Sequence, residues 1–136
     1  MERIKRVEMA VEALQLPEYA MTHLQGTALI CARLAQARGE NPELAYIAGL
    51  LHDVAAYRNG SALNHARLGA AWAEKLLRQL GGFAEAEIRV IHDAIYLHSD
   101  KTVVHGPFAQ LLKEADVRQK DGRDIPGSKD SWHFSV

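Results

Sequence analysis

Histidine and aspartate side chains recur in this sequence at positions where helical periodicity turns them toward an apolar interior. Seven histidines occur among its 136 residues. His23 shares one predicted helix face with Ile30 and Leu34, because steps of three and four residues return to the same face. His52 closes the most apolar run of the chain, and Asp53 lies about 100° round the same helical turn. Imidazole and carboxylate groups therefore point toward the core from two predicted helices.

The second half of the chain repeats this pattern. His98 ends an apolar stripe that includes Ile91 and Ile95, and Asp116 is the inward-facing last member of another stripe. His65 opens a predicted helix earlier in the chain, between Asp53 and His98. Burial of an ionised aspartate without a partner costs several kcal/mol. The position of Asp116 therefore predicts either a cation on its inward side or a helix that presents a different face to the core.

Two interpretations fit these placements. Taken singly, a histidine on an apolar stripe is typical of a hydrogen-bonded core residue, and a carboxylate at a helix end is typical of a cap. Taken together, they are explained by one shared metal site, because imidazole and carboxylate suit first-row divalent ions. We therefore predict a divalent metal ion, with Fe, Mn, Co, Ni, Mg and Zn as the candidates.

The elements that must position these side chains are all predicted to be helices. Glycine and proline interrupt the helical periodicity at intervals, and no strand pattern occurs. Asn41 and Pro42 supply an N-cap and a first-turn proline, and Gly39 is a helix stop. The sequence predicts one compact all-α domain over residues 1–121, of about six helices, followed by a loosely ordered tail over 122–136. The expected helices cover 2–14, 18–38, 42–57, 62–80, 84–98 and 107–121.

Composition excludes several classes of protein. The chain is 48% hydrophobic and 24% charged, which is typical of a globular domain. A net charge of −1 creates no overall field that would attract long nucleic acids or anionic lipid. The longest apolar stretch, 44–51, is too short for a membrane span, and the charged N-terminus does not resemble a secretory signal. Cys31 is the single cysteine, so we expect a cytoplasmic protein without a disulfide.

The ordered set of histidines and aspartates resembles the HD superfamily of metal-dependent phosphohydrolases. The likeness extends over residues 20–118, and the local sequence around each member agrees with it. Residues 48–53, Ala-Gly-Leu-Leu-His-Asp, resemble the apolar run into the family's His-Asp doublet. The other matching segments are His65-Ala66-Arg67-Leu68-Gly69-Ala70, Ala94-Ile95-Tyr96-Leu97-His98 and Glu114-Ala115-Asp116.

This resemblance implies an all-helical domain with a metal site at its centre. One ion would be held by His23, His52, Asp53 and Asp116, and a second by His65 and His98 with Asp53 as the bridge. The resemblance also implies that Asp53, His65 and His98 take part in catalysis. The sequence departs from several subfamilies directly after the doublet, where residues 54–56 are Val-Ala-Ala instead of a glycine followed by a basic residue.

The implied reaction is hydrolysis of a phosphomonoester or phosphodiester, with nucleotides among the candidate substrates. A divalent ion lowers the pKa of bound water and neutralises charge on a phosphoryl group. Basic side chains near the predicted site are candidates for holding the substrate: Arg58, Lys101, Lys113 and Arg118. We expect His105 and His133 to face solvent. The second His-Asp doublet, His92 and Asp93, falls off the inward helix face and is not expected to bind metal.

Three other functions are compatible with the same residues. The domain could bind metal and sense a ligand without useful turnover, which the apolar residues after the doublet favour. It could be a structural helical bundle with packed histidines. It could also be an oxygenase with a mixed-valence di-iron centre on the same fold. Turnover on phosphoesters separates the enzyme from the sensing module, and metal content tests the structural bundle.

Overall fold

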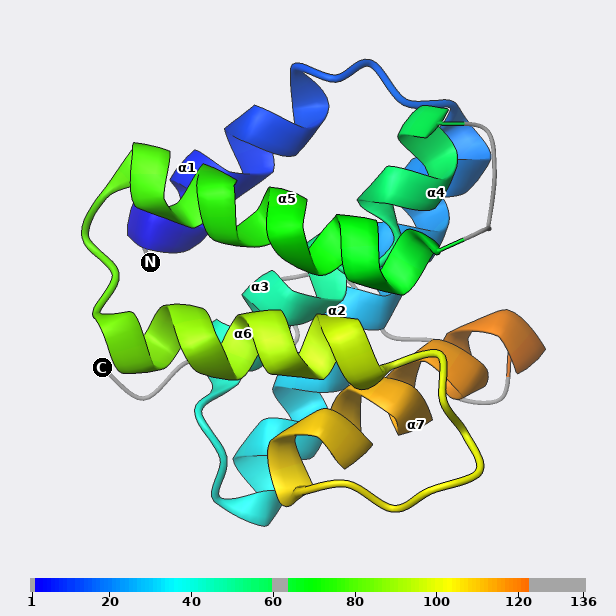
Figure 1. Cartoon of the computed structure of the whole chain (residues 1–136). Coiled ribbons are helices and arrows are strands. Elements are labelled where there is room, and N and C mark those ends of the chain that lie inside the picture. The colour runs from blue at the N-terminus through cyan, green and yellow to red at the C-terminus, as the bar shows by residue number, and fades with distance from the viewer. Residues whose placement is uncertain (1, 60–63, 123–136) are drawn as a thin grey trace.

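A computed structural model describes residues 2–59 and 64–122, and these form a helical domain (Figure 1). No strand occurs among these residues, so the predicted all-α fold is confirmed. The predicted tail lies outside the described residues except for Gly122. The helices are α1 (Glu2–Glu12), α2 (Glu18–Arg38), α3 (Pro42–Leu51), α4 (Val54–Asn59), α5 (His65–Leu80), α6 (Glu85–Leu97) and α7 (Pro107–Asp121).

The helix boundaries follow the residues that begin and end helices in general. Asn41 caps α3 through its side chain, which accepts a hydrogen bond from the backbone N–H of Leu44 at 3.1 Å, and Pro42 follows at the first position. Gly39 ends α2 in the left-handed conformation, with φ of 74°, which glycine adopts at low cost. Both features agree with the sequence-based expectation.

The predicted helix over 42–57 is divided in the structure. The chain leaves α3 at Leu51, turns at His52 and Asp53, and enters α4 at Val54. Nδ1 of His52 lies 2.6 Å from the carbonyl oxygen of Gly49, three residues earlier. Side-chain hydrogen bonds of this kind compete with the helical backbone ladder. The break therefore occurs at the two residues that the sequence marks for chemistry.

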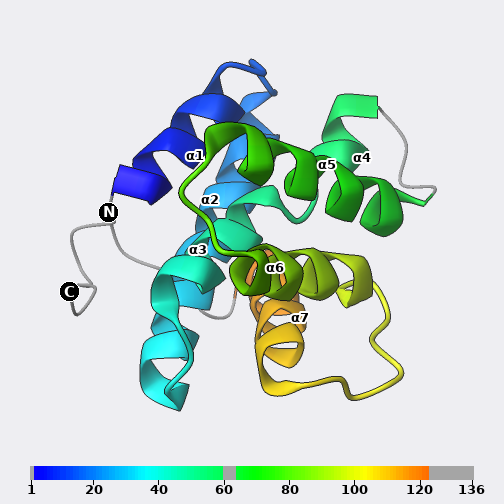
Figure 2. The same cartoon turned by 60° about the vertical axis from the view of Figure 1, so that its left-hand side comes forward.

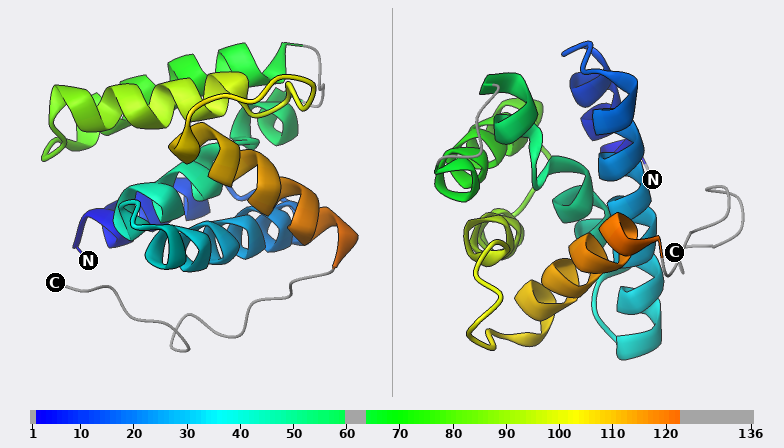
Figure 3. Two further views of the ribbon diagram at one scale, coloured as in Figure 1. Left: turned by 90° about the horizontal axis from the view of Figure 1, so that it is seen from below. Right: turned by 90° about the vertical axis from the view of Figure 1, so that its right-hand side faces the viewer.

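Helix α3 is the central element of the domain. Eight of its ten residues are buried, and it packs against α1, α2, α6 and α7. Figure 3 shows α3 enclosed by these helices. Helices α5, α6 and α7 pack in sequence, α7 also packs against α2, and α1 contacts both α3 and α5 (Figure 2). The C-terminal end of α3 thus opens into the middle of the molecule.

A close approach of α2 and α3 sets the distance between their side chains. A Cβ atom at Gly49 would lie 2.7 Å from the Cα of Ala28, which is closer than real contacts allow. Glycine at this position therefore lets the two backbones touch. As a result, His23 on α2 and His52 after α3 come within hydrogen-bonding distance of each other.

No helix in the described ranges is both long enough and apolar enough to cross a membrane.

Candidate metal centre

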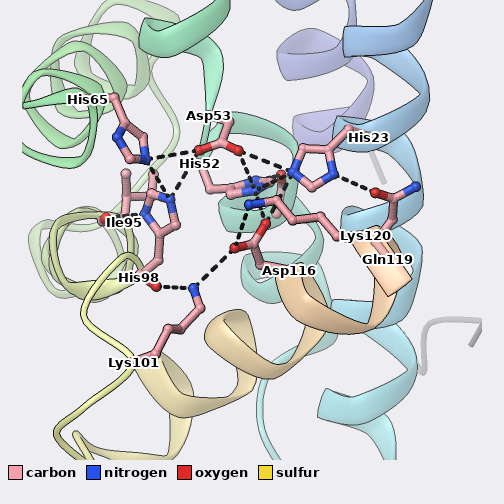
Figure 4. Close-up of polar contacts among 11 residues, drawn as sticks. His23, His52, Asp53, His65, Ile95, His98, Lys101, Asp116, Gln119 and Lys120 are labelled. Atoms are coloured by element: carbon pink, nitrogen blue, oxygen red, sulfur yellow. Dashed lines mark hydrogen bonds and ion pairs between the residues drawn. The ribbon is translucent and has the colours of Figure 1, made fainter. Parts of the chain in front are cut away.

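Four predicted metal ligands meet at the end of α3. His23 comes from α2, His52 and Asp53 from the α3–α4 turn, and Asp116 from α7 (Figure 4). Nε2 of His23 lies 3.1 Å from Nε2 of His52, 3.1 Å from Oδ2 of Asp53 and 3.1 Å from Oδ1 of Asp116. Nε2 of His52 lies 3.3 Å from Oδ2 of Asp53 and 3.2 Å from Oδ1 of Asp116.

These separations are those of atoms that share one cation. Nitrogen and oxygen ligands about 2.0–2.1 Å from an ion lie roughly 2.8–3.4 Å from their neighbours in the coordination shell. The set joins two imidazole nitrogens to two carboxylate oxygens, which is a donor set for first-row divalent metals. We refer to these four side chains as the first cluster. Their chemistry and spacing fit a metal ion.

A second cluster shares Asp53 with the first. Oδ1 of Asp53 lies 3.1 Å from Nε2 of His98 and 3.3 Å from Nε2 of His65, and the two histidine nitrogens are 3.3 Å apart. The Oδ2 atom of the same carboxylate faces His23 and His52 (Figure 4). Each oxygen of Asp53 therefore serves one cluster, which is the arrangement of a bridging carboxylate.

Backbone carbonyls fix the orientation of two of the histidine rings. Nδ1 of His52 faces the carbonyl oxygen of Gly49 at 2.6 Å, and Nδ1 of His98 faces that of Ile95 at 2.6 Å. Both histidines directly follow the last residue of a helix and use the carbonyl three residues earlier. When Nδ1 donates its proton to a carbonyl, Nε2 keeps the lone pair that a metal requires. The helix ends thus present Nε2 to the two clusters.

Charge compensation within the first cluster is strong. Burial raises the pKa of Asp53, but His52, His23 and His98 outweigh it and hold that pKa well below its usual range. The pKa of Asp116 is lowered for the same reason, against the effect of burial, by His23 and His52. Burial lowers the pKa of His52, but Asp53 and Asp116 raise it overall. Both carboxylates are therefore ionised, and a bound cation would replace protons on the histidines.

Two lysines flank the outer oxygen of Asp116. Nζ of Lys101 lies 3.1 Å from Oδ2 of Asp116 and also donates to the carbonyl of His98 (Figure 4). Nζ of Lys120 lies 3.6 Å from the same Oδ2 atom. Lys101 was a predicted substrate-binding residue, whereas Lys120 was not predicted. Positive charge thus borders the first cluster on the side of α7.

Three of the predicted substrate-binding residues line one hollow next to the clusters. Its volume is about 380 Å³. Within it, Nζ of Lys113 donates to the carbonyl of Val103 at 2.8 Å, and Arg118 pairs with Glu114 at 2.8 Å. Lys113 therefore also holds the loop before α7 in place. The hollow is lined by Lys101, Gln110, Lys113, Glu114, Val117 and Arg118.

Other candidates from the sequence lie outside the clusters. Arg58 is exposed on α4 and faces a different hollow, which it shares with Trp72 and Lys75 of α5. Asp93 is about half exposed and lies 2.9 Å from Nδ1 of its neighbour His92. His105, expected to face solvent, is half-buried, and its Nδ1 lies 2.5 Å from Nζ of Lys113. His133 is outside the described residues.

Besides Lys120, sequence reasoning missed two residues that contact or border the first cluster. Oε1 of Gln119 lies 2.5 Å from Nδ1 of His23. Gln119 follows Asp116 by three residues, a spacing that places both on one side of α7. The ring of Tyr57 lies beside that of His23. Burial raises the pKa of Tyr57 to about 12, and the charge of Asp53 adds to this rise. The only sequence signals for these two residues are their spacings: Gln119 follows Asp116 by three positions, and Tyr57 follows Asp53 by four.

Comparison with known proteins identifies the family of this chain. An all-helical domain with paired His/Asp clusters defines a candidate metalloprotein. The family model for the HD domain matches residues 20–121. The chain therefore belongs to the HD superfamily of metal-dependent phosphohydrolases. No solved structure matches the chain.

Proposed function

We propose that this protein is a phosphohydrolase that uses two divalent ions to cleave a phosphomonoester or phosphodiester. The observation that carries the proposal is the division of Asp53, whose Oδ2 faces His23 and His52 while Oδ1 faces His65 and His98. One ion would be held by the first cluster and the other by Asp53, His65 and His98. A carboxylate between two sets of imidazoles is the form of a two-metal site.

The donor set favours some ions over others. Four imidazoles and two carboxylates meet in the two clusters. Imidazole suits Fe, Ni and Zn, and carboxylate suits Mn, whereas Mg²⁺ prefers a shell made only of oxygen ligands and retains several waters. We therefore rank Mg²⁺ last among the candidates. When bound, such ions supply a nucleophile derived from water at neutral pH and neutralise charge on the phosphoryl group.

The side chains around the clusters support an anionic substrate. Lys101 and Lys120 neutralise Asp116 in the absence of a ligand. Once a cation binds Asp116, both ammonium groups are available to a phosphoryl oxygen. The hollow beside Lys101 is also lined by Arg118 and by the buried Lys113, and it would hold another anionic part of the substrate, such as a second phosphate. Nucleotides are candidates within this class.

The cellular setting is part of the same proposal. We place the protein in the cytoplasm, because its one cysteine, Cys31, is buried and free, as is usual in a reducing compartment. We propose small phosphoesters as its partners, and neither membranes nor long nucleic acids. The formal net charge of −1 supports this view.

The proposal is tested by metal content and turnover together. Protein purified without chelator should contain about two transition-metal ions per chain, measured by elemental analysis. It should release phosphate or a phosphomonoester from a panel of nucleotides and small phosphoesters with Mn²⁺, Fe²⁺, Co²⁺, Ni²⁺ or Mg²⁺ supplied, and a chelator should stop the reaction. Protein that binds no metal would disprove the proposal.

One observation favours a second function, a ligand-sensing module without turnover. Val54, Ala55 and Ala56 follow the His-Asp doublet, and the first two are buried, so this turn offers no cationic side chain to a substrate. Full metal loading without turnover on any phosphoester, combined with measurable binding of a phosphoester, would support the sensing function instead.

A further inference from the structure

Two tyrosines lie one helical turn from residues of the first cluster. Tyr19 precedes His23 by four residues on α2, and Tyr57 follows Asp53 by four residues on α4. The backbone N–H of Tyr57 donates to the carbonyl of Asp53 at 3.3 Å, which keeps them on successive turns. Residues four apart share a helix face. Each tyrosine is therefore on the same side of its helix as a proposed ligand.

The rings of these residues form a path from the cluster to the surface. The ring centroid of Tyr57 lies 6.3 Å from that of His23, at an interplanar angle of 69°. The ring of Tyr19 lies 5.8 Å from that of Tyr57, at 75°. Tyr57 is partly buried, but Tyr19 is 70% exposed. The ring of Tyr19 is thus open to solvent, and the ring of Tyr57 lies between it and the proposed ligand His23.

The side chains of the two clusters differ in how far they are exposed to solvent. The side chain of His52 is fully buried, whereas that of His65 is 20% exposed and those of Asp53 and His23 keep some contact with solvent. Tyr57 is attached to Asp53 by one helical turn and contacts His23. The aromatic path therefore starts from ligands that keep slight contact with solvent, not from the fully buried His52.

We propose that Tyr19 and Tyr57 form a stacking surface for a flat aromatic group of the substrate, such as a nucleobase. This inference rests on the proposed phosphohydrolase function and narrows its substrate class to phosphoesters that carry an aromatic ring. Stacking of a base on an aromatic side chain strengthens binding roughly 5- to 150-fold, the equivalent of about 1–3 kcal/mol. Lys101 and Lys120 provide the complementary charge for the phosphoryl group.

A purely structural role for the pair makes different predictions. An edge-to-face contact between Tyr19 and Tyr57 joins α2 to α4 and contributes to stability. In that case, loss of the Tyr19 ring lowers the melting temperature and weakens all ligands alike. A stacking role instead affects only ligands that contain an aromatic ring.

The experiment compares two ligands that differ only in the base. The probes are the 5′-phosphonate analogues of adenosine and of ribose, in which carbon replaces the scissile oxygen, and binding to the Mn²⁺-loaded full chain is measured by calorimetry. We expect the wild-type protein to bind the adenosine analogue 5- to 150-fold more tightly. Tyr19→Ala should reduce this preference to less than twofold, and Tyr19→Phe should keep it.

Tyr96→Ala is the matched control. Tyr96 is 49% exposed and packs on His92, away from both clusters, so this variant should keep the wild-type preference. Equal binding of both analogues by the wild-type protein would overturn the stacking role and leave the phosphohydrolase proposal intact. An unchanged preference in Tyr19→Ala would also overturn it. Failure of both analogues to bind the wild-type protein would count against both proposals.

Discussion

Nδ1 of His23 lies 2.5 Å from Oε1 of Gln119, so a side chain of α7 orients a histidine of α2. His52 and His98 use backbone carbonyls for the same purpose. An amide oxygen can only accept a hydrogen bond, so Nδ1 of His23 carries the proton and Nε2 faces Asp53 and Asp116. Of these three histidines, only His23 is oriented by a side chain, so only its supporting hydrogen bond can be removed by a substitution.

Replacement of Gln119 should therefore weaken the first metal site. Loss of such a supporting hydrogen bond costs about 10- to 100-fold in metal affinity. We expect Gln119→Ala to show a loss in this range when metal binding is measured by competition with a chelator. Gln119→Glu, which keeps an acceptor oxygen, should recover part of it. Gln79→Ala on α5, which lines the separate hollow near Arg58, is the control. An unchanged affinity in Gln119→Ala would show that His23 needs no support from α7.

Asp53 should be the residue whose loss affects both ions. Its two oxygens serve different clusters, so Asp53→Ala removes one ligand from each. We expect this variant to retain no metal after desalting and to lose turnover. His52→Ala should likewise lose metal and activity, through the first cluster. The measurement is elemental analysis of folded protein, with circular dichroism as the check on folding. Full metal content in the Asp53 variant would refute its bridging role.

His65 and His98 test whether the site holds two ions. Their Nε2 atoms face Oδ1 of Asp53 and each other, and the ring of His98 also lies beside that of His52. His65→Ala or His98→Ala should therefore lower the bound metal from about two ions to one and largely abolish turnover. His65 is the cleaner choice because it is partly exposed, whereas His98 is buried. If the wild-type protein binds one ion and neither substitution changes that number, the binuclear proposal fails.

Sequence periodicity predicted the site better than it predicted the path of the chain. The inward faces of α2, α6 and α7 followed from apolar spacing, and the structure brings His23, His98 and Asp116 into the two clusters. The break between α3 and α4 did not follow, because Val54, Ala55 and Ala56 continue a helical pattern. The turn coincides with a local hydrogen bond between the ring of His52 and the carbonyl of Gly49, which apolar spacing does not predict.

The surroundings of the site were the least predictable part. Lys101, Lys113 and Arg118 were grouped by nearness to His98 and Asp116 in the sequence, and the structure places them around one hollow. Arg58 was grouped by the same argument, yet its exposed side chain faces the outer surface of α5. Whether a surface cation meets the site depends on the packing angle of its helix. That angle is set by contacts distant in sequence.

Asp93 should be dispensable although it forms a second His-Asp doublet. Its side chain is 54% exposed, and it lies near His92 and, at 3.9 Å, Arg89. Exposed pairs of this kind contribute little to stability, about 0–1 kcal/mol. Asp93→Ala should keep wild-type metal content, turnover and melting temperature within error. A variant without metal would mean that α6 presents a different face to the site.

Gly49 should be required for both packing and metal binding. A Cβ at this position would lie 2.7 Å from Cα and 2.9 Å from N of Ala28, and backbone atoms cannot move aside as a flexible side chain can. Overpacking of this kind costs typically about 1–3 kcal/mol. Gly49→Ala should therefore lower the melting temperature, and it should weaken metal binding because α2 and α3 carry His23 and His52.

Gly69→Ala is the matched control. Gly69 is buried in the interior of α5, but its nearest neighbour would be 3.5 Å from the new Cβ, an ordinary contact. Since alanine favours helices over glycine by roughly 0.5–1 kcal/mol, Gly69→Ala should be neutral or stabilising. Thermal unfolding followed by chelator competition measures both effects. Equal stability of the two variants would show that the close approach of α2 and α3 does not depend on Gly49.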